Sequence, residues 1–132
     1  MYSAPASAAR VLVIDDDENV RLLFSRALKL DGYDVGTAGT AEEALSLVRE
    51  ARPSAIFLDL RMPYVNGAGF LFRLREDPAI RDIPVAVITG MTSLDQTALA
   101  EIKALGARVW FKPLSISEIG AIAKTLLTTV DK

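Results

Sequence analysis

The chain has 132 residues, of which 51% are hydrophobic and 24% charged, so its length and composition fit one globular domain. It contains neither cysteine nor histidine, which excludes disulfides, thiolate chemistry, a serine–histidine triad and histidine metal sites, and a cytoplasmic location is our expectation. The formal net charge of −2 argues against a non-specific nucleic-acid binder, and no apolar run reaches the ~20 residues that span a bilayer.

Residues 1–9 are mostly small and lack both a basic segment and an apolar core, so we expect a disordered tail and not a signal peptide. Residues 10–132 alternate between short apolar runs and longer segments with helical periodicity. In chain order these predict strand Val11–Ile14, a helix ending at Gly32, strand Tyr33–Ala38, a helix from Thr40 to Glu50, strand Ala55–Asp59, a helix over Ala68–Glu76, strand Val85–Ile88, a helix from Ser93 to Gly106, strand Val109–Phe111 and a helix opened by Ser115.

Capping boxes mark the starts of three predicted helices, because a Ser or Thr in each lies three residues before a Glu or Gln. The pairs are Thr40 with Glu43, Ser93 with Gln96, and Ser115 with Glu118. Gly32 and Gly106 are predicted to end the preceding helices, because glycine readily adopts a left-handed backbone.

Strands that alternate with helices through short loops predict a parallel sheet with helices on both faces. Right-handed crossovers favour a flavodoxin-like (βα)5 three-layer sandwich, whose five parallel strands lie in the order 2-1-3-4-5. No repeat, linker or low-complexity segment divides residues 10–132, so we expect one domain there.

Polar side chains stand where four of the predicted strands end. The central example is Asp59, which follows four apolar residues and precedes the strand-breaking pair Met62-Pro63. The others are Asp15 and Asp16 after the first strand, Thr89 after the fourth and Lys112 after the fifth. Because the carboxyl ends of parallel strands share one edge of the sheet, we expect these groups to lie close together.

Three carboxylates and one ammonium would leave this edge negatively charged. Two like charges about 4 Å apart repel by about 4 kcal/mol at an effective dielectric of roughly 20, so a divalent cation would stabilise the cluster. Oxygen donors without Cys or His favour Mg²⁺ over zinc.

A carboxylate beside Mg²⁺, a hydroxyl and an ammonium suits the acceptance of a phosphoryl group. Asp59 would attack as the nucleophile, and Lys112 and Thr89 would neutralise the charge on the transferring oxygens. No general base is needed, because Asp59 is already ionised at neutral pH.

From about Arg10 to its end, the sequence resembles the response-regulator receiver domains of two-component signalling. The motifs that carry the resemblance are Val11-Leu12-Val13-Ile14-Asp15-Asp16, Leu58-Asp59-Leu60-Arg61-Met62-Pro63, Asn66-Gly67, Val87-Ile88-Thr89-Gly90 and Lys112-Pro113. The resemblance implies a single-domain receiver in which Asp59 accepts the phosphoryl group and Thr89 and Lys112 contact it. It also implies Mg²⁺ ligands from Asp15, Asp16, Asp59 and the backbone carbonyl of Arg61.

The resemblance further implies partners and a mode of action. A sensor histidine kinase or a histidine phosphotransfer protein would supply the phosphoryl group in a phosphorelay. The chain would catalyse its own phosphorylation and autodephosphorylation without being a conventional enzyme. A downstream protein would bind the face made by the fourth helix, fifth strand and fifth helix. We expect no direct contact with nucleic acid or membrane, and a monomer or a phosphorylation-dependent dimer.

One departure from the family pattern concerns the fifth strand. The family couples the Thr89 position to an aromatic residue three positions before the lysine, which here is Val109. Trp110 is the alternative, although alternation along a strand places it on the opposite face from Val109.

Other interpretations remain open at this stage. Asp15 and Asp16 could cap the first helix, as we expect Asp17 to do, and Asp59, Thr89 and Lys112 could be ordinary strand-end residues. The unusual fifth strand leaves room for a receiver-like binding module that is regulated without phosphorylation. The Asp15-x-Asp17 match leaves a haloacid-dehalogenase-type phosphohydrolase as a weaker alternative, in which Asp15 and not Asp59 would be the nucleophile.

Overall fold

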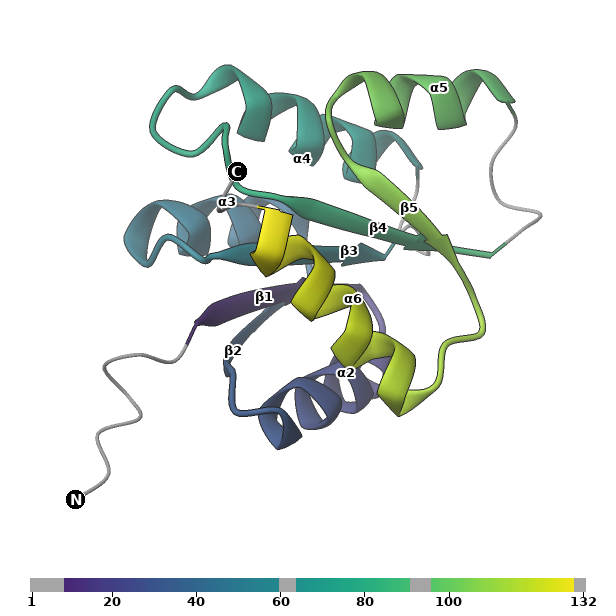
Figure 1. The fold of residues 1–132 in the computed structure, drawn as a ribbon. Coiled ribbons are helices and arrows are strands. Elements are labelled where there is room, and N and C mark those ends of the chain that lie inside the picture. The colour runs from purple at the N-terminus through teal and green to yellow at the C-terminus, as the bar shows by residue number, and fades with distance from the viewer. Residues whose placement is uncertain (1–8, 60–63, 91–95, 130–132) are drawn as a thin grey trace.

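The computed structural model describes residues 9–59, 64–90 and 96–129 of the chain. Helices and strands alternate along these residues (Figure 1). In order they are β1 (Arg10–Ile14), α2 (Glu18–Leu30), β2 (Asp34–Ala38), α3 (Ala41–Glu50), β3 (Ala55–Asp59), α4 (Tyr64–Glu76), β4 (Val85–Thr89), α5 (Gln96–Ala104), β5 (Arg108–Phe111) and α6 (Ile116–Thr129).

The strands form one sheet in the order β2-β1-β3-β4-β5, and each neighbouring pair is parallel. The predicted strand order and the flavodoxin-like fold are therefore confirmed. Because every strand runs the same way, all of them end at the same edge of the sheet, toward the right in Figure 1.

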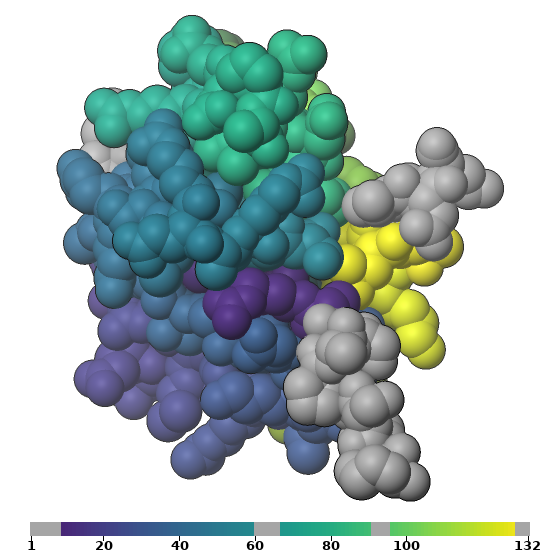
Figure 2. All heavy atoms as spheres, turned by 90° about the vertical axis from the view of Figure 1, so that its left-hand side faces the viewer, coloured from purple at the N-terminus to yellow at the C-terminus, as the bar shows by residue number. Residues whose placement is uncertain are grey.

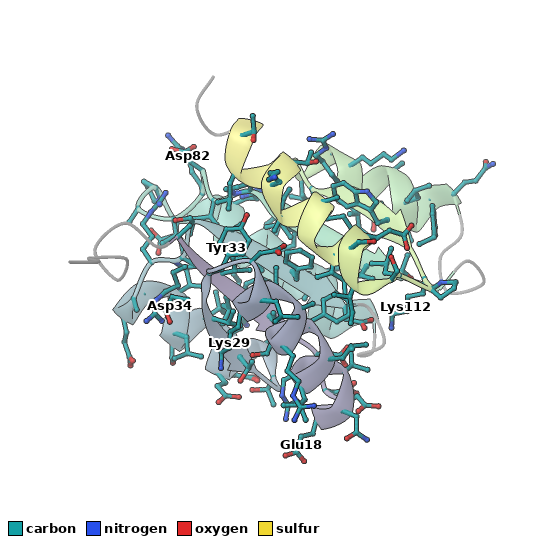
Figure 3. The ribbon with its side chains drawn as sticks, turned by 60° about the horizontal axis from the view of Figure 1, so that its bottom comes forward. Glu18, Lys29, Tyr33, Asp34, Asp82 and Lys112 are labelled. Atoms are coloured by element: carbon teal, nitrogen blue, oxygen red, sulfur yellow. The ribbon has the colours of Figure 1, made fainter. Side chains whose placement is uncertain are left out.

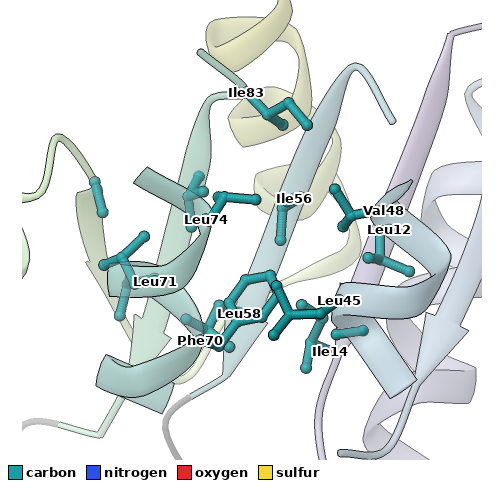
Figure 4. Close-up of a cluster of buried hydrophobic side chains, with 14 of the residues drawn as sticks. Leu12, Ile14, Leu45, Val48, Ile56, Leu58, Phe70, Leu71, Leu74 and Ile83 are labelled. Atoms are coloured by element: carbon teal, nitrogen blue, oxygen red, sulfur yellow. The ribbon is translucent and has the colours of Figure 1, made fainter. Parts of the chain in front are cut away.

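Two hydrophobic clusters hold the helices against the two faces of the sheet. One joins the sheet to α3, α4 and α5, and Figure 4 shows part of it, with Leu45 and Val48 of α3 and Phe70 and Leu74 of α4 around Leu58 of the sheet. The other joins the opposite face to α2 and α6. Since β3 lies at the centre of the sheet, its residues are buried on both faces, as its continuous apolar run predicted.

The predicted ends of the elements are mostly close to the observed ones, with one clear exception. Helix α4 begins at Tyr64, whereas the predicted helix began at Ala68, after a loop that led to Gly67. Asn66 and Gly67 have low intrinsic helix propensity, yet they lie within the helix. The tertiary contacts of Phe70, Leu71 and Leu74 outweigh that local preference.

The capping residues are positioned as the sequence predicted where the structure describes them. Thr40 Oγ1 accepts the Glu43 N–H at 3.1 Å, and Ser115 Oγ accepts the Glu118 N–H at 3.1 Å. Gly32 and Gly106 adopt positive φ angles of 91° and 79° after the helices they terminate. Ser93 and its predicted capping role lie outside the described residues.

The edge of the sheet where the strands begin lies opposite the predicted site. Figure 2 shows it, with the start of β1 in purple at the surface. There the Ala9 carbonyl accepts the Asp34 N–H, and Arg10 pairs with the Asp34 carboxylate at 2.9 Å. Residues 1–8 of the predicted tail lie outside the described residues. Within the part of the chain that is described, no helix is both long enough and apolar enough to cross a membrane.

Candidate functional site

Asp15 and Asp59 are neighbours at the carboxyl edge of the sheet. Ile14 of β1 pairs with Leu58 of β3, so the next residue of each strand brings these two aspartates side by side. Both are buried, with exposed fractions of 0% for Asp15 and 4% for Asp59. Apolar side chains, including Phe24 and Phe57, line the small hollow beneath them. The two carboxyl groups therefore share an environment of low polarity.

The polar atoms of Asp15 are almost all engaged by the protein. Its N–H donates to the Ala38 carbonyl at 3.1 Å, and its Oδ1 accepts the Asp17 N–H at 2.9 Å. Asp15 Oδ2 is buried and accepts no hydrogen bond from the described residues. The helix cap is Asp17, whose carboxylate accepts the Asn19 and Val20 N–H groups, so its expected role as a cap is confirmed.

The acidic cluster strongly perturbs the ionisation of Asp15. The pKa of Asp15 rises from 3.8 to about 8, and burial of the carboxyl group is the main cause. Asp59 is the next cause, because it shares a hydrogen bond with Asp15 and carries a like charge. A smaller upward contribution comes from the Asp16 carboxyl, which therefore also reaches Asp15, although Asp16 is exposed to solvent. In the absence of a cation, Asp15 consequently tends to hold a proton at neutral pH.

The residues present fit a hard divalent cation. The buried Asp15 Oδ2 without a donor, next to a second carboxylate, is the kind of oxygen ligand that Mg²⁺ takes. Across residues 9–59, 64–90 and 96–129, no group of three or more acidic side chains lies close enough together to hold a metal ion. Mg²⁺, however, commonly uses one or two carboxylates and keeps several waters. Arg61, whose carbonyl is a predicted ligand, lies outside the described residues, so the full ligand set stays a prediction.

Lys112 reaches Asp59 from the end of β5. Its Nζ lies 2.5 Å from Asp59 Oδ2, and about a quarter of the Lys112 side chain (25%) is exposed. The backbone N–H of Lys112 donates to the Thr89 carbonyl at 2.8 Å, which extends the pairing of β4 and β5 by one residue. In Figure 3, Lys112 lies at the opposite end of the molecule from Asp34, which begins β2, and from Asp82, which precedes β4.

Thr89 stands at the same rim but on the other face of the sheet. Ile88 pairs with Asp59, so Thr89 lies one residue beyond that pairing, and alternation points its side chain toward the face covered by α3, α4 and α5. The Thr89 hydroxyl is buried and donates to the Gly90 carbonyl at 3.2 Å.

The structure also describes the fifth strand, where the sequence departs from the family pattern. Val109 packs against the cluster on the α3, α4 and α5 face, whereas Trp110 packs against the cluster on the α2 and α6 face. The predicted opposition of these two side chains is therefore correct. The residue in register with Thr89 is Phe111, which is 42% exposed, and neither Val109 nor Trp110 occupies that position.

Arg21 is a residue that the sequence analysis did not single out. It lies on α2, and its Nη1 donates to the Asp15 carbonyl at 2.6 Å. Its sequence signal is its place in the first turns of the helix that follows Asp15, from where a long side chain, directed toward the helix N-terminus, can reach back to the sheet edge.

Taken together, the described geometry provides a buried nucleophilic carboxylate, an ammonium in contact with it and an acidic neighbour with one free oxygen. This combination can bind a tetrahedral anion together with a divalent cation, because the cation would neutralise the carboxylates and, with the Lys112 ammonium, would offset the charge of the anion.

The chain is similar in sequence to known proteins of one family. The family profile described as "Response regulator receiver domain" matches residues 11–124. The chain is 38% identical over 121 residues to "Transcriptional regulatory protein PrrA" of Mycobacterium leprae (strain TN), which covers 92% of this chain and 51% of that protein. It is 35% identical over 125 residues to "Probable transcriptional regulator ycf27" of Porphyridium aerugineum, covering 93% and 50%.

The chain thus spans about half the length of these curated relatives. Among solved structures, the chemotaxis protein CheY4 of Vibrio cholerae superposes with a TM-score of 0.81 at 30% identity, covering 91% of this chain and 99% of that one.

Proposed function

The chain belongs to the response regulator receiver domain family of two-component systems, and from this premise we propose that it is a switch that is phosphorylated on Asp59. The observation that carries the proposal is the ion pair between Lys112 and Asp59, 2.5 Å long, beside the buried Asp15. An ammonium held on one oxygen of a buried carboxylate can move to an oxygen of an incoming phosphoryl group.

The transfer would proceed by nucleophilic attack. A carboxylate oxygen of Asp59 forms a bond to phosphorus while the phosphorus–nitrogen bond of a phosphohistidine breaks, and the imidazole leaves with the electron pair. Lys112 then stabilises a phosphoryl oxygen, and the Thr89 hydroxyl contacts another. Later attack by water on phosphorus regenerates the Asp59 carboxylate and releases inorganic phosphate.

Mg²⁺ is the cofactor that we propose for this site. When bound, it supplies positive charge next to the transferring oxygens, which a cluster of carboxylates alone would repel. Asp15 and Asp16 would hold it, together with Asp59 and the carbonyl of Arg61. The buried oxygen of Asp15 that accepts no described hydrogen bond supports this assignment.

The donor that we propose is a phosphohistidine on a sensor histidine kinase or a histidine phosphotransfer protein, and the location that we propose is the cytoplasm. Because the 132 residues contain no histidine, the phosphohistidine would lie outside this sequence. Phosphorylation would change binding to a downstream protein on the face made by α5, β5 and α6.

Incubation with acetyl phosphate and Mg²⁺, followed by intact-mass spectrometry, tests this function. We expect one added phosphoryl group on the wild type, none on Asp59→Asn, and an unchanged gain on the control Asp82→Asn, an exposed position at the other edge of the sheet. A wild type that takes up no phosphoryl group would favour the phosphorylation-independent module. Loss of uptake in Asp15→Asn with retention in Asp59→Asn would favour the phosphohydrolase.

A further inference from the structure

We propose that Arg21 is a positioning residue for the metal-binding carboxylates: its guanidinium fixes the backbone of Asp15 so that Asp15 Oδ2 stays available to Mg²⁺. This inference rests on the proposed function of the site, which it deepens by one residue. Arg21 would act through Asp15 and would not itself touch the phosphoryl group.

The protein binds Asp15 at most of its polar atoms. Its N–H is bound by Ala38, its Oδ1 by the Asp17 N–H, and its carbonyl by Arg21 Nη1 at 2.6 Å. Only Asp15 Oδ2 accepts no described hydrogen bond. The Arg21 guanidinium is a side-chain group that holds the Asp15 backbone carbonyl, whereas backbone groups bind the Asp15 N–H and Oδ1.

The fold leaves space for the Arg21 guanidinium beside Gly39. A Cβ atom on Gly39, the residue after β2, would lie 3.0 Å from Arg21 Nη1, which is closer than Cβ contacts normally come. Among the described glycines, positive φ angles occur at Gly32 and Gly106 and not at Gly39, so Gly39 provides room and not an unusual backbone conformation. Arg21 therefore fills the gap between the ends of β1 and β2.

The Arg21 contact also suits the electrostatics of a cation site. Arg21 binds a neutral carbonyl, so it fixes the loop after β1 while leaving the Asp15 carboxylate free to bind a cation. A lysine could supply the charge, but its single ammonium lacks the planar group that bonds one strand end while packing against the other.

Isothermal titration calorimetry with Mg²⁺ as the probe tests the proposal on the whole chain. We expect Arg21→Ala to weaken Mg²⁺ binding roughly tenfold or more, as loss of a group that orients a metal ligand typically does, and Arg21→Lys to restore part of the affinity. The matched control is Arg26→Ala, which removes the same charge from an exposed position of the same helix and should leave the affinity close to that of the wild type.

A second variant separates positioning from folding. Gly39→Ala keeps Arg21 but crowds its guanidinium, so we expect weaker Mg²⁺ binding while the far-UV circular dichroism stays that of the wild type. In both Arg21→Ala and Gly39→Ala, the Mg²⁺ concentration that half-saturates phosphorylation by acetyl phosphate should rise, while the rate at saturating Mg²⁺ stays near that of the wild type. A merely structural role would lower the saturated rate as well.

The outcomes distinguish this inference from the function on which it rests. If the wild type binds Mg²⁺ and takes up phosphate but folded Arg21→Ala and Gly39→Ala bind Mg²⁺ as tightly as it does, Arg21 has no positioning role. If Arg26→Ala weakens binding as much as Arg21→Ala, the effect is one of general charge and the proposal is wrong. If the wild type itself binds no Mg²⁺, the proposed function and this inference both fail.

Discussion

Burial of two carboxylates side by side destabilises the folded chain, and two features reduce this destabilisation at Asp15 and Asp59. Lys112 neutralises Asp59, and Asp15 retains a proton because its pKa is raised to about 8. Replacing such groups by apolar residues often stabilises a protein, so their presence here suits a site that exchanges a proton for a cation. We therefore interpret the cluster as a cation-binding site that, without a cation, is stabilised by the Lys112 ammonium and by a proton on Asp15.

Removal of the Asp59 charge should relax the ionisation of Asp15. In Asp59→Asn we expect the pKa of Asp15 to fall from about 8, but to stay above 3.8, because burial, the largest cause, remains. Carbon-13 NMR titration of the Asp15 side-chain carboxyl measures this. The control Asp34→Asn, in the ion pair at the opposite edge of the sheet, should leave the titration of Asp15 unchanged. An unaltered Asp15 titration in Asp59→Asn would contradict the coupling of the two groups.

Loss of the Lys112 charge should destabilise the metal-free protein. We expect Lys112→Met to lower the free energy of unfolding at pH 7 by about 2 kcal/mol, less than for a fully buried pair because the lysine is partly exposed. Urea denaturation in the presence of a chelator measures the loss. Lys103→Met, an exposed lysine of α5, is the control and should change little. Equal stabilities of Lys112→Met and the wild type would mean that the ion pair contributes nothing.

At the scale of the elements, the start of α6 is fixed by a reciprocal cap. Ser115 Oγ accepts the Glu118 N–H, and the Glu118 carboxylate accepts the Ser115 N–H at 2.7 Å. The hydrogen bond from the Ser115 backbone N–H, followed by one from the Ser115 side chain, lowers the pKa of Glu118. Since α6 follows the Lys112-Pro113 segment directly, the cap defines where the lysine-bearing loop must end.

Loss of this cap should be felt by the helix and not by the site. We expect Ser115→Ala to lower the free energy of unfolding by roughly 1 kcal/mol. It should raise the pKa of Glu118 only in part, because the backbone N–H of residue 115, the larger cause of the lowered pKa, remains. Thermal denaturation and an NMR titration of Glu118 measure the two effects, and Ser115→Thr, which keeps a hydroxyl cap, should show neither. A Glu118 titration that is the same in Ser115→Ala as in the wild type would exclude the Ser115 hydroxyl as a cause.

The elements also show what the sequence could and could not predict. The continuous apolar run of β3 and the polar residues after four of the strands predicted the sheet and the edge that carries the candidate site, because burial and strand ends are local signals. The start of α4 was wrong, since the packing of Phe70 and Leu74 overrides the weak helix propensity of Asn66-Gly67. The pairing of Phe111 with Thr89 depends on strand register, and the contact of Arg21 depends on tertiary geometry, so neither could be predicted from local pattern.

At the scale of the whole molecule, the two hydrophobic clusters hold α2 and α6 on one face of the sheet and α3, α4 and α5 on the other. The candidate site lies at the carboxyl edge of the sheet between these two helix layers. Asp15, Asp59 and Lys112 come from the ends of three different strands. Stability of the whole chain and occupation of the site are therefore linked, because the site residues are ordered only in the folded sheet.

This linkage predicts how stability depends on pH. Asp15 has a raised pKa in the folded chain, so the folded state binds more protons than the unfolded state between about pH 4 and pH 8. The contribution of Asp15 is fully present below the lower value and is lost as the pH rises through the upper one. We therefore expect that, in the presence of a chelator, loss of the Asp15 contribution lowers the melting temperature between pH 5 and pH 8.5. Added Mg²⁺ should raise the melting temperature again, most strongly at the higher pH.

The control for this pH dependence is Asp15→Asn, which cannot ionise. Its melting temperature in a chelator should fall less between the two pH values than that of the wild type, and Mg²⁺ should raise it little. Wild-type and Asp15→Asn curves that run parallel over this range, with the same response to Mg²⁺, would show that Asp15 is not the group responsible.

The most direct test of the account is to locate the phosphoryl group chemically. The chain is incubated with acetyl phosphate and Mg²⁺, reduced with borohydride, which converts an aspartyl phosphate to homoserine, and digested for peptide mass spectrometry. The account predicts conversion at Asp59, dependent on Mg²⁺ and absent from Asp59→Asn. Conversion at Asp15 or Asp16, or uptake of phosphate with no conversion at Asp59, would contradict it.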